Sequence, residues 1–141
     1  MKPVDQKLLS ILKSDARIST SDLARRLDLS RSTIQSKIKK LEQQGVIKGY
    51  TVIYGDEYEN RLVSAHVLIK VVQKLTDKTN KELGSMPEVC ALHAISGDFD
   101  LIAMLKTETT QALSRVLDEI SNLEGVERTN SSVVLETKFS R

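Results

Sequence analysis

The chain lacks tryptophan, has one cysteine and two prolines among its 141 residues, and only 4% of its residues are aromatic. A hydrophobic core must therefore be built mainly from Leu, Ile and Val. The single Cys90 excludes an internal disulfide and a multi-cysteine metal site, which is typical of a cytoplasmic protein. No apolar run is long enough to span a membrane, and the N-terminus is polar by its fifth residue. We therefore expect a cytoplasmic protein without a membrane segment or a signal peptide.

The net charge of +2 conceals an uneven distribution of charge along the chain. Residues 1–50 hold 11 Lys and Arg against 5 Asp and Glu, a net of +6, whereas residues 51–141 hold 10 against 14, a net of −4. A basic N-terminal third predicts contact with a polyanion. The acidic remainder predicts a different task for the rest of the chain.

The N-terminal third shows the pattern of three short amphipathic helices. Residues 4–14 repeat apolar side chains at helical spacing. Residues 19–27 begin with Ser and carry Asp three positions later, which resembles a capping box. Residues 30–44 begin with another serine cap and end before Gly45, a residue that suits a left-handed helix end. Because the last two helices are joined by a tight turn, the segment predicts a helix-turn-helix.

The third of these helices carries more positive charge than its packing requires. With Ile34, Ile38 and Leu41 buried, its open side is polar and basic, the chemistry that reads bases and phosphates in the DNA major groove. Any solvated helix can carry lysines, but the cap, turn, basic helix and glycine taken together favour double-stranded DNA as a partner. A small β wing is expected over residues 45–53. The expected DNA-binding residues are Arg31, Ser32, Thr33, Gln35, Ser36, Lys37, Lys39, Lys40 and Lys48.

The acidic, aperiodic stretch 54–61 is expected to link a domain over residues 1–53 to another over residues 62–141. Beyond it, alternating apolar residues predict strands, and two amphipathic stretches predict helices that begin near Thr76 and at Thr107 or Thr109. The expected strands cover residues 63–71, 88–96, 99–106 and 126–139. The order β-α-β-β-α-β is the split ferredoxin-like pattern, so the expected fold class is α+β.

Two helices can cover only one face of such a sheet, yet both alternating sets of the second strand contain apolar residues. One set is Cys90, Leu92 and Ala94, and the other is Val89, Ala91 and Ile95. A large apolar face left in water would be unusual. We therefore expect a homodimer formed through the open sheet face, which would give the DNA-binding end a two-fold symmetry.

Five segments in this order and spacing carry a resemblance to a known family: DARIS, LARRLDLS, KIKKLEQQGVIKGY, PEVCALHAISGDFDLI and LEGVERTNSSVVL. They resemble the leucine-responsive regulatory protein/asparagine regulator (Lrp/AsnC) family of transcriptional regulators over nearly the whole chain. The resemblance implies a DNA-binding regulator that is not an enzyme and needs no cofactor. It also implies dimers that assemble into octamers, with an amino acid or a related small molecule bound between dimers at the C-terminal domain.

By the same resemblance, the effector pocket centres on Gly97 and Asp100, with the start of the last strand nearby. A carboxylate there could hold an ammonium group, while backbone N–H groups and hydroxyls take a carboxylate. A simple polar hairpin turn is the alternative interpretation. The expected effector-binding residues are Ser96, Gly97, Asp98, Asp100, Thr129, Asn130 and Ser131.

Other chemistry has weaker support in the sequence. His66 and His93 lack neighbouring ligands and are expected to be structural, Cys90 is expected to be a small buried hydrophobe, and no metal site is expected. The acid pair Asp98 and Asp100 lacks a partner base or a phosphate-binding motif. Sirohaem decarboxylases are similar to this architecture, so an enzyme of that kind is the alternative function. A sensing module without DNA affinity is a third reading.

Overall fold

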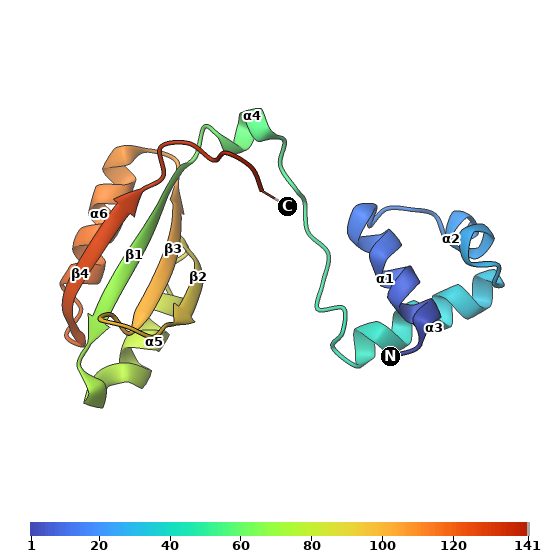
Figure 1. The fold of residues 1–141 in the computed structure, drawn as a ribbon, viewed down its shortest axis with the longest axis horizontal. Helices are drawn as coiled ribbons and strands as arrows, with labels where there is room; N and C mark the ends of the chain where they lie inside the picture. Colours follow the sequence, from blue (N-terminus) through green and yellow to red (C-terminus); the bar gives the residue numbers. More distant parts are fainter. Residues whose placement is uncertain (141) are drawn as a thin grey trace. The chain divides into compact units, whose positions relative to one another are not determined.

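The computed structural model describes residues 1–140, which divide into a compact unit over Met1–Ile53 and another that begins at Tyr54 (Figure 1). Within the described residues each unit has its own cluster of buried apolar side chains. No helix in this part of the chain is both long enough and apolar enough to cross a membrane.

The first unit contains the helices α1 (Pro3–Ser14), α2 (Thr20–Leu27) and α3 (Arg31–Gln43). The predicted serine caps are confirmed: the Asp22 N–H donates to Ser19 Oγ and the Thr33 N–H donates to Ser30 Oγ, each at 3.1 Å. The Asp22 carboxylate does not complete a capping box, because it pairs with Arg25. Each cap satisfies a backbone N–H that the helix itself leaves without a partner.

The helices of the first unit are held together by aliphatic side chains that meet in one cluster. Leu8 of α1, Leu23 of α2 and Ile34 of α3 are almost fully buried, and Leu41 joins them. Burying one such side chain stabilises a fold by about 1.5–3 kcal/mol. Gly45 has a φ of +74° and ends α3 as predicted.

Residues 45–53, where a β wing is expected, follow α3 without regular secondary structure. All of these residues are described, and none of them lies in a strand. The Ile47 N–H donates to the Leu41 carbonyl at 3.1 Å, which turns the chain back against α3. Val52 and Ile53 are 74% and 86% exposed. A lone extended segment forms no strand here because no neighbouring segment pairs with its N–H and C=O groups.

The second unit confirms the β-α-β-β-α-β order over its described residues. Its elements are α4 (Asp56–Glu59), β1 (Val63–Val71), a 3₁₀ turn (Gln73–Leu75), α5 (Thr76–Gly84), β2 (Val89–Ala94), β3 (Leu101–Thr107), α6 (Thr110–Ser121) and β4 (Val126–Val133). The four strands form an antiparallel sheet in the order β2-β3-β1-β4 (Figure 1). The last strand is shorter than predicted, and residues 134–140 have no regular structure. The capping alternative resolves to Thr109, whose Oγ1 accepts from the Ala112 N–H at 3.0 Å.

One face of the sheet is covered by α5 and α6. On this face, Val67 and Ile69 of β1 are fully buried and pack in one cluster with Leu83 of α5 and Ile120 of α6. Gly125 lies where α6 returns to β4, and a Cβ at this position would collide with the Thr79 hydroxyl. The close packing of the Thr79 and Leu75 side chains against this position therefore requires glycine there.

The second strand contains a β-bulge that the sequence pattern did not indicate. Val89 is opposite Leu105 but Ala91 is opposite Met104, so the register shifts at Cys90. Val89 therefore packs against the core together with Leu92, whereas the expectation placed it with Ala91. The expectation of a buried Cys90 is also wrong, because the bulge leaves it exposed.

Among residues 1–140, no helix lies over the other sheet face, which is only partly apolar. Leu68 and Ile102 face each other on neighbouring strands and are half-buried, and Met104 beside them is exposed. His66 and His93 are on this face too and are exposed, so neither is a buried structural histidine. Within residues 1–140 no group of three or more His, Cys, Asp or Glu side chains could hold a metal ion.

Candidate DNA interface and effector site

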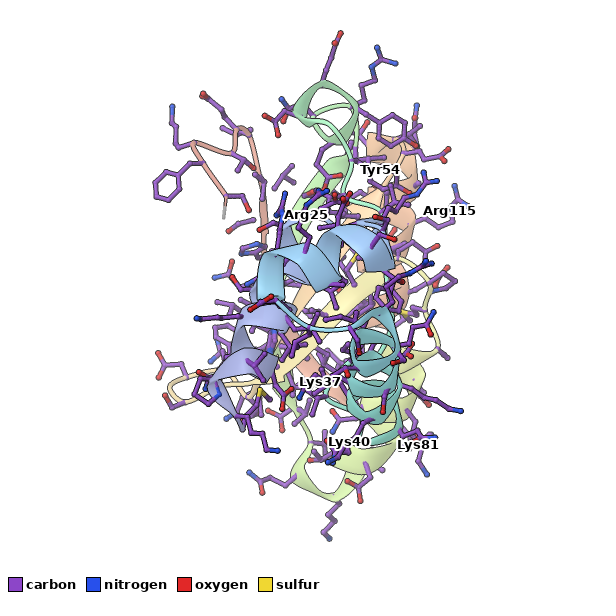
Figure 2. All side chains as sticks on the ribbon, turned by 90° about the vertical axis from the view of Figure 1, so that its right-hand side faces the viewer. Arg25, Lys37, Lys40, Tyr54, Lys81 and Arg115 are labelled. Carbon is purple, nitrogen blue, oxygen red and sulfur yellow. The ribbon has the colours of Figure 1, made fainter. Side chains whose placement is uncertain are left out.

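The outward side of α3 is polar over its whole length. Ser32, Ser36, Lys39 and Gln43 follow one another at helical spacing and are all exposed, opposite the buried Ile34. Figure 2 shows Lys37 and Lys40 on α3, with Arg25 on α2. A helix held by one apolar stripe, with hydroxyls, amides and ammonium groups on the opposite side, can lie in a duplex groove.

The structure separates the expected DNA-binding residues into exposed and engaged groups. Thr33 is half-buried and its hydroxyl lies 2.7 Å from Ser30 Oγ. Lys37 is half-buried as well, and its Nζ lies 3.2 Å from the Asp5 carboxylate of α1. The Ser32 hydroxyl lies 3.2 Å from Ser30 Oγ too, but its side chain is exposed. The other exposed residues are Arg31, Gln35, Ser36, Lys39, Lys40 and Lys48.

Two residues near the end of α3 were not among the expected site residues. Gln43 lies one helical turn beyond Lys39 on the same exposed side, and its spacing from Ser36 would have indicated it. Glu42 accepts a hydrogen bond from the Tyr50 hydroxyl at 3.5 Å. Partial desolvation and the nearby Glu42 charge raise the pKa of Tyr50 above its usual value. This bond joins the segment after α3 to the helix.

The expected effector hairpin is attached to the end of β1 by its own aspartate. The Asp100 N–H donates to the Ile69 carbonyl, and the Val71 N–H donates to Asp100 Oδ2, each at 2.9 Å. Asp100 Oδ1 also lies 3.6 Å from Lys70 Nζ. Gly97, with a φ of +111°, provides the turn conformation that a side chain would disfavour. Asp100 is therefore engaged in holding the hairpin in place.

Only part of the expected effector set lies on one face of the sheet. Ile69 of β1 pairs with Leu101 of β3 and with Thr129 of β4, so the hairpin and the start of β4 are at the same end of the sheet. Thr129 Oγ1 lies 3.3 Å from Ser121 Oγ of α6, on the helix-covered face. Ser131, opposite the buried Val67, shares that face. Asn130 is on the open face.

A contact between the hairpin and β4 involves two residues outside the expected set. The Arg128 guanidinium carbon lies 4.6 Å from the centre of the Phe99 ring. Phe99 belongs to the hairpin, and Arg128 lies in β4 directly before the expected effector-binding residues Thr129 to Ser131. An aromatic residue within the SGDFD turn and an arginine before the polar run of β4 were the available signals, but only the sheet order brings them together.

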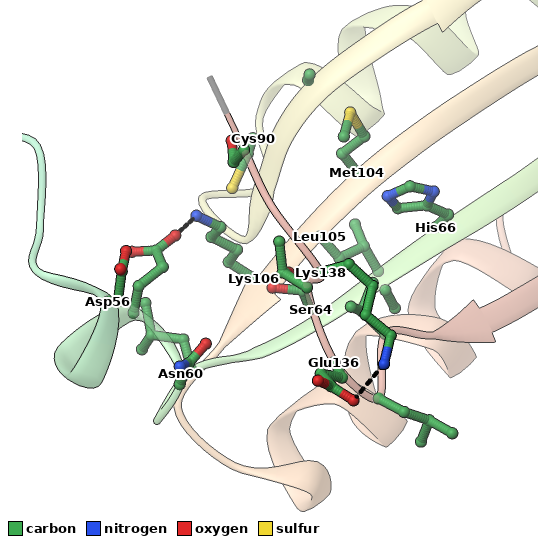
Figure 3. Close-up of a pocket in the computed structure, with 18 of the residues that line it drawn as sticks. Asp56, Asn60, Ser64, His66, Cys90, Met104, Leu105, Lys106, Glu136 and Lys138 are labelled. Carbon is green, nitrogen blue, oxygen red and sulfur yellow. Dashed lines mark hydrogen bonds and ion pairs between the residues drawn. The ribbon is translucent and has the colours of Figure 1, made fainter.

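A cavity of about 800 Å³ lies at the other end of the open face (Figure 3). Asp56 and Asn60, Ser64 of β1 and the segment 134–140 contribute to its lining. Lys106 pairs with Glu59 on one side of it, and Lys138 pairs with Glu136 on another at 3.0 Å. None of the expected effector-binding residues lines this cavity.

Both units match models of known protein families. The Lrp/AsnC ligand binding domain matches residues 64–141, and a winged helix-turn-helix DNA-binding domain matches residues 1–48. The regulator LysM of Saccharolobus solfataricus is 33% identical over 135 residues, covering 96% of this chain and 94% of that protein. The regulator FL11 of Pyrococcus furiosus is 30% identical over 133 residues, covering 94% of this chain and 88% of that protein.

A solved structure of a transcriptional regulator from Neisseria meningitidis in complex with L-Met shares the fold. Its TM-score is 0.88 at 24% identity, covering 99% of this chain and 93% of that one. The curated relatives are HTH-type transcriptional regulators, so this chain is a regulator and not an enzyme of the sirohaem-decarboxylase kind. The matched helix-turn-helix likewise removes the reading as a sensing module alone. The chain belongs to the Lrp/AsnC family of DNA-binding transcriptional regulators, and its second unit is the ligand-binding domain of that family.

Proposed function

We propose that α3 reads a specific DNA sequence in the major groove and that an amino acid bound at the hairpin end of the sheet sets the affinity for that DNA. The observation that carries the first part is a set of cations without internal partners. Within the described residues, none of Arg31, Lys39 and Lys40 forms an ion pair with a carboxylate. Their charge is therefore available to phosphates or bases.

The side chains of α3 would divide this work by chemistry. Arg31 and Gln35 have the donors and acceptors that pair with guanine and adenine edges, and Ser36 can donate to either kind of group. Lys39 and Lys40, with Lys48 after the helix, provide positive charge toward the DNA backbone. Phosphate neutralisation would dominate the affinity, so binding should weaken steeply with salt.

The amino-acid effector is supported by the matched ligand-binding domain and by the chemistry of the hairpin end. The related regulator from Neisseria meningitidis was solved with L-Met, an amino acid. The hairpin and β4 bring backbone groups, hydroxyls and charges of both signs to one end of the sheet, which suits a zwitterion. The site would include Ser96, Gly97, Asp98 and Asn130 directly and Asp100 through the hairpin that it holds. Thr129 and Ser131 would contribute from the other face.

Self-association through the open sheet face is the remaining part of the proposal. Leu68 and Ile102 of that face are half-buried and Met104 is 37% exposed, and no helix of the described part of the chain lies over them. A second copy would cover these side chains and would match the two-fold symmetry of a palindromic operator. Such dimers would assemble further into octamers. The protein would act in the cytoplasm, where the DNA of bacteria and archaea lies.

Selection of bound DNA from a random pool, repeated with and without a mixture of amino acids, tests both activities together. We expect an enriched, approximately two-fold symmetric motif and a change in recovery when amino acids are added. A pool that stays random would overturn the DNA-reading proposal. An enriched motif with the same recovery in both arms would overturn the amino-acid effector and leave the DNA-reading proposal standing.

A further inference from the structure

We propose that Arg128 binds the carboxylate of the effector and that the Phe99 ring holds its guanidinium group in place for this purpose. The inference rests on the proposed function, because it assumes that the effector binds at the hairpin end of the sheet. It names a binding residue outside the set expected from the sequence.

At this end of the sheet, one cationic side chain has no anionic partner among the described residues. Lys70 and Arg128 are direct cross-strand neighbours of β1 and β4. Lys70 has an anionic partner in Asp100, 3.6 Å away. No Asp or Glu within the described residues lies within ion-pair distance of Arg128. A guanidinium group that the fold positions but does not neutralise can accept an anionic partner from outside.

The Phe99 ring restricts where that guanidinium group can be. Their separation of 4.6 Å is well within the range of about 6 Å for a cation–π contact. Such a contact uses the face of the aromatic ring and leaves N–H groups at the edge of the guanidinium free to donate. Those N–H groups form a rigid fork that matches the two oxygens of a carboxylate, which a lysine ammonium group does not.

The neighbouring acid residues are consistent with a zwitterionic ligand. Asp100 accepts the Val71 N–H and faces Lys70, so its carboxylate is already engaged. Asp98 precedes Phe99 directly, is exposed, and has no ion-pair partner among the described residues. Arg128 for the carboxylate and Asp98 for the ammonium group would together match the two charges of a free amino acid.

The test compares amino acids with their amides, which keep the ammonium group and side chain but lose the carboxylate charge. The standard L-amino acids are first screened one by one against the full chain by thermal shift. Affinities of each amino acid that binds, and of its amide, are then measured by titration calorimetry. The variants are Arg128→Gln, Arg128→Lys and, as a matched control on an exposed part of α6, Arg115→Gln.

We expect the unaltered chain to prefer the amino acid over its amide by about 10- to 100-fold, the range for a hydrogen bond between charged groups. Arg128→Gln should lose most of this preference, by weakening the amino acid and leaving the amide nearly unchanged. Arg128→Lys should keep an intermediate preference, because charge remains but the fork is lost. If the Arg128→Gln variant does not fold, the preference measured for Arg128→Lys still tests the proposal. Arg115→Gln should match the unaltered chain.

An unchanged preference in both Arg128 variants would overturn the role of Arg128 and leave the proposed amino-acid effector standing. Equal weakening of amino acid and amide would also overturn it, because that result indicates a structural effect on the site. The absence of any binding amino acid in the first screen would overturn the proposed effector itself, and the role of Arg128 with it.

Discussion

Lys37 of α3 and Asp5 of α1 form an ion pair across the first unit, with Nζ and Oδ1 3.2 Å apart and the two side chains only 22% and 19% exposed. Lys37 was expected to contact DNA, yet its charge is engaged with a partner 32 positions away. This pair links the start of the domain to the proposed recognition helix. The position of α3 is therefore set by charge as well as by the aliphatic core.

The first prediction separates Lys37 from its neighbour Lys40. Lys37→Met should lower the free energy of unfolding by about 1–3 kcal/mol, because it leaves Asp5 partly buried without a partner. Lys40→Met, at an exposed position, should leave stability within about 0.5 kcal/mol. Urea unfolding measures both. Equal stability of the two variants, with equal losses of DNA affinity, would show that Lys37 acts as a phosphate contact instead.

The second prediction concerns sequence reading by α3. Gln35→Ala should cost about 1–3 kcal/mol at one base position and relax the preference there, whereas Lys40→Ala should weaken binding to all sequences alike. Fluorescence anisotropy with an operator and its single-base variants measures both effects over a range of salt concentrations. Lys81→Ala, in α5 of the other unit, is the matched control. Unchanged selectivity and an unchanged salt slope would remove α3 from the interface.

The third prediction concerns the contact between Gly125 and Thr79. Gly125→Ala should destabilise the second unit by about 1–3 kcal/mol, because the added Cβ collides with the Thr79 hydroxyl. Thr79→Ala in the same chain should restore part of that loss by making room. Gly55→Ala, where a Cβ would meet nothing within 4 Å, is the control. Strict additivity of the first two substitutions in thermal unfolding would contradict the contact.

The fourth prediction concerns the open sheet face. Met104→Lys should shift a self-associating chain toward monomer, because it places a charge among apolar side chains that a second copy would cover. Ser114→Lys adds the same charge on the exposed side of α6 and should leave the assembly unchanged. Sedimentation velocity measures the oligomeric state of the two variants and of the unaltered chain. If Met104→Lys assembles as the unaltered chain does, another surface forms the dimer.

The fifth prediction concerns Tyr50. Partial desolvation and the Glu42 carboxylate raise the pKa of its hydroxyl above the usual 10.0, since the phenolate would be a second negative charge beside Glu42. Glu42→Gln should therefore lower the pKa of Tyr50. Because the pKa of Tyr50 is raised in the folded state, folding favours the protonated hydroxyl over the phenolate. The stability that depends on this hydroxyl is fully present below pH 10 and is lost as pH rises through the pKa of the folded state. Ultraviolet titration with Tyr54 and Tyr58 changed to Phe measures it, and no shift would mean that the contact is absent in solution.

Much of the fold could be predicted because its signals are local in the chain. Ser19 and Ser30 cap helices through N–H groups three positions away, and Gly45 ends α3 by its own backbone conformation. The alternation along β1 likewise reports its buried face directly. The missing strand over 45–53 shows the limit, because a β-prone segment becomes a strand only when a neighbour pairs with it.

The candidate site was less predictable because its decisive contacts join distant parts of the chain. Asp100 was expected to be free for a ligand, but the Val71 N–H and Lys70 engage it. The expected set did not contain Arg128, and Thr129 and Ser131 face the helices. Sheet order and register decide these placements, and both depend on pairing between segments far apart in sequence.

The sequence by itself determined the helix-turn-helix, the order of strands and helices, and the membership in a regulator family, because spacing and capping act over a few residues. Only the tertiary structure decided which charges are free. It paired Lys37 with Asp5 and Lys70 with Asp100, placed Arg128 against Phe99, and left Lys39 and Lys40 without internal partners among the described residues. The reason is that neutralisation of a charge depends on distance in space, which position along the chain does not specify.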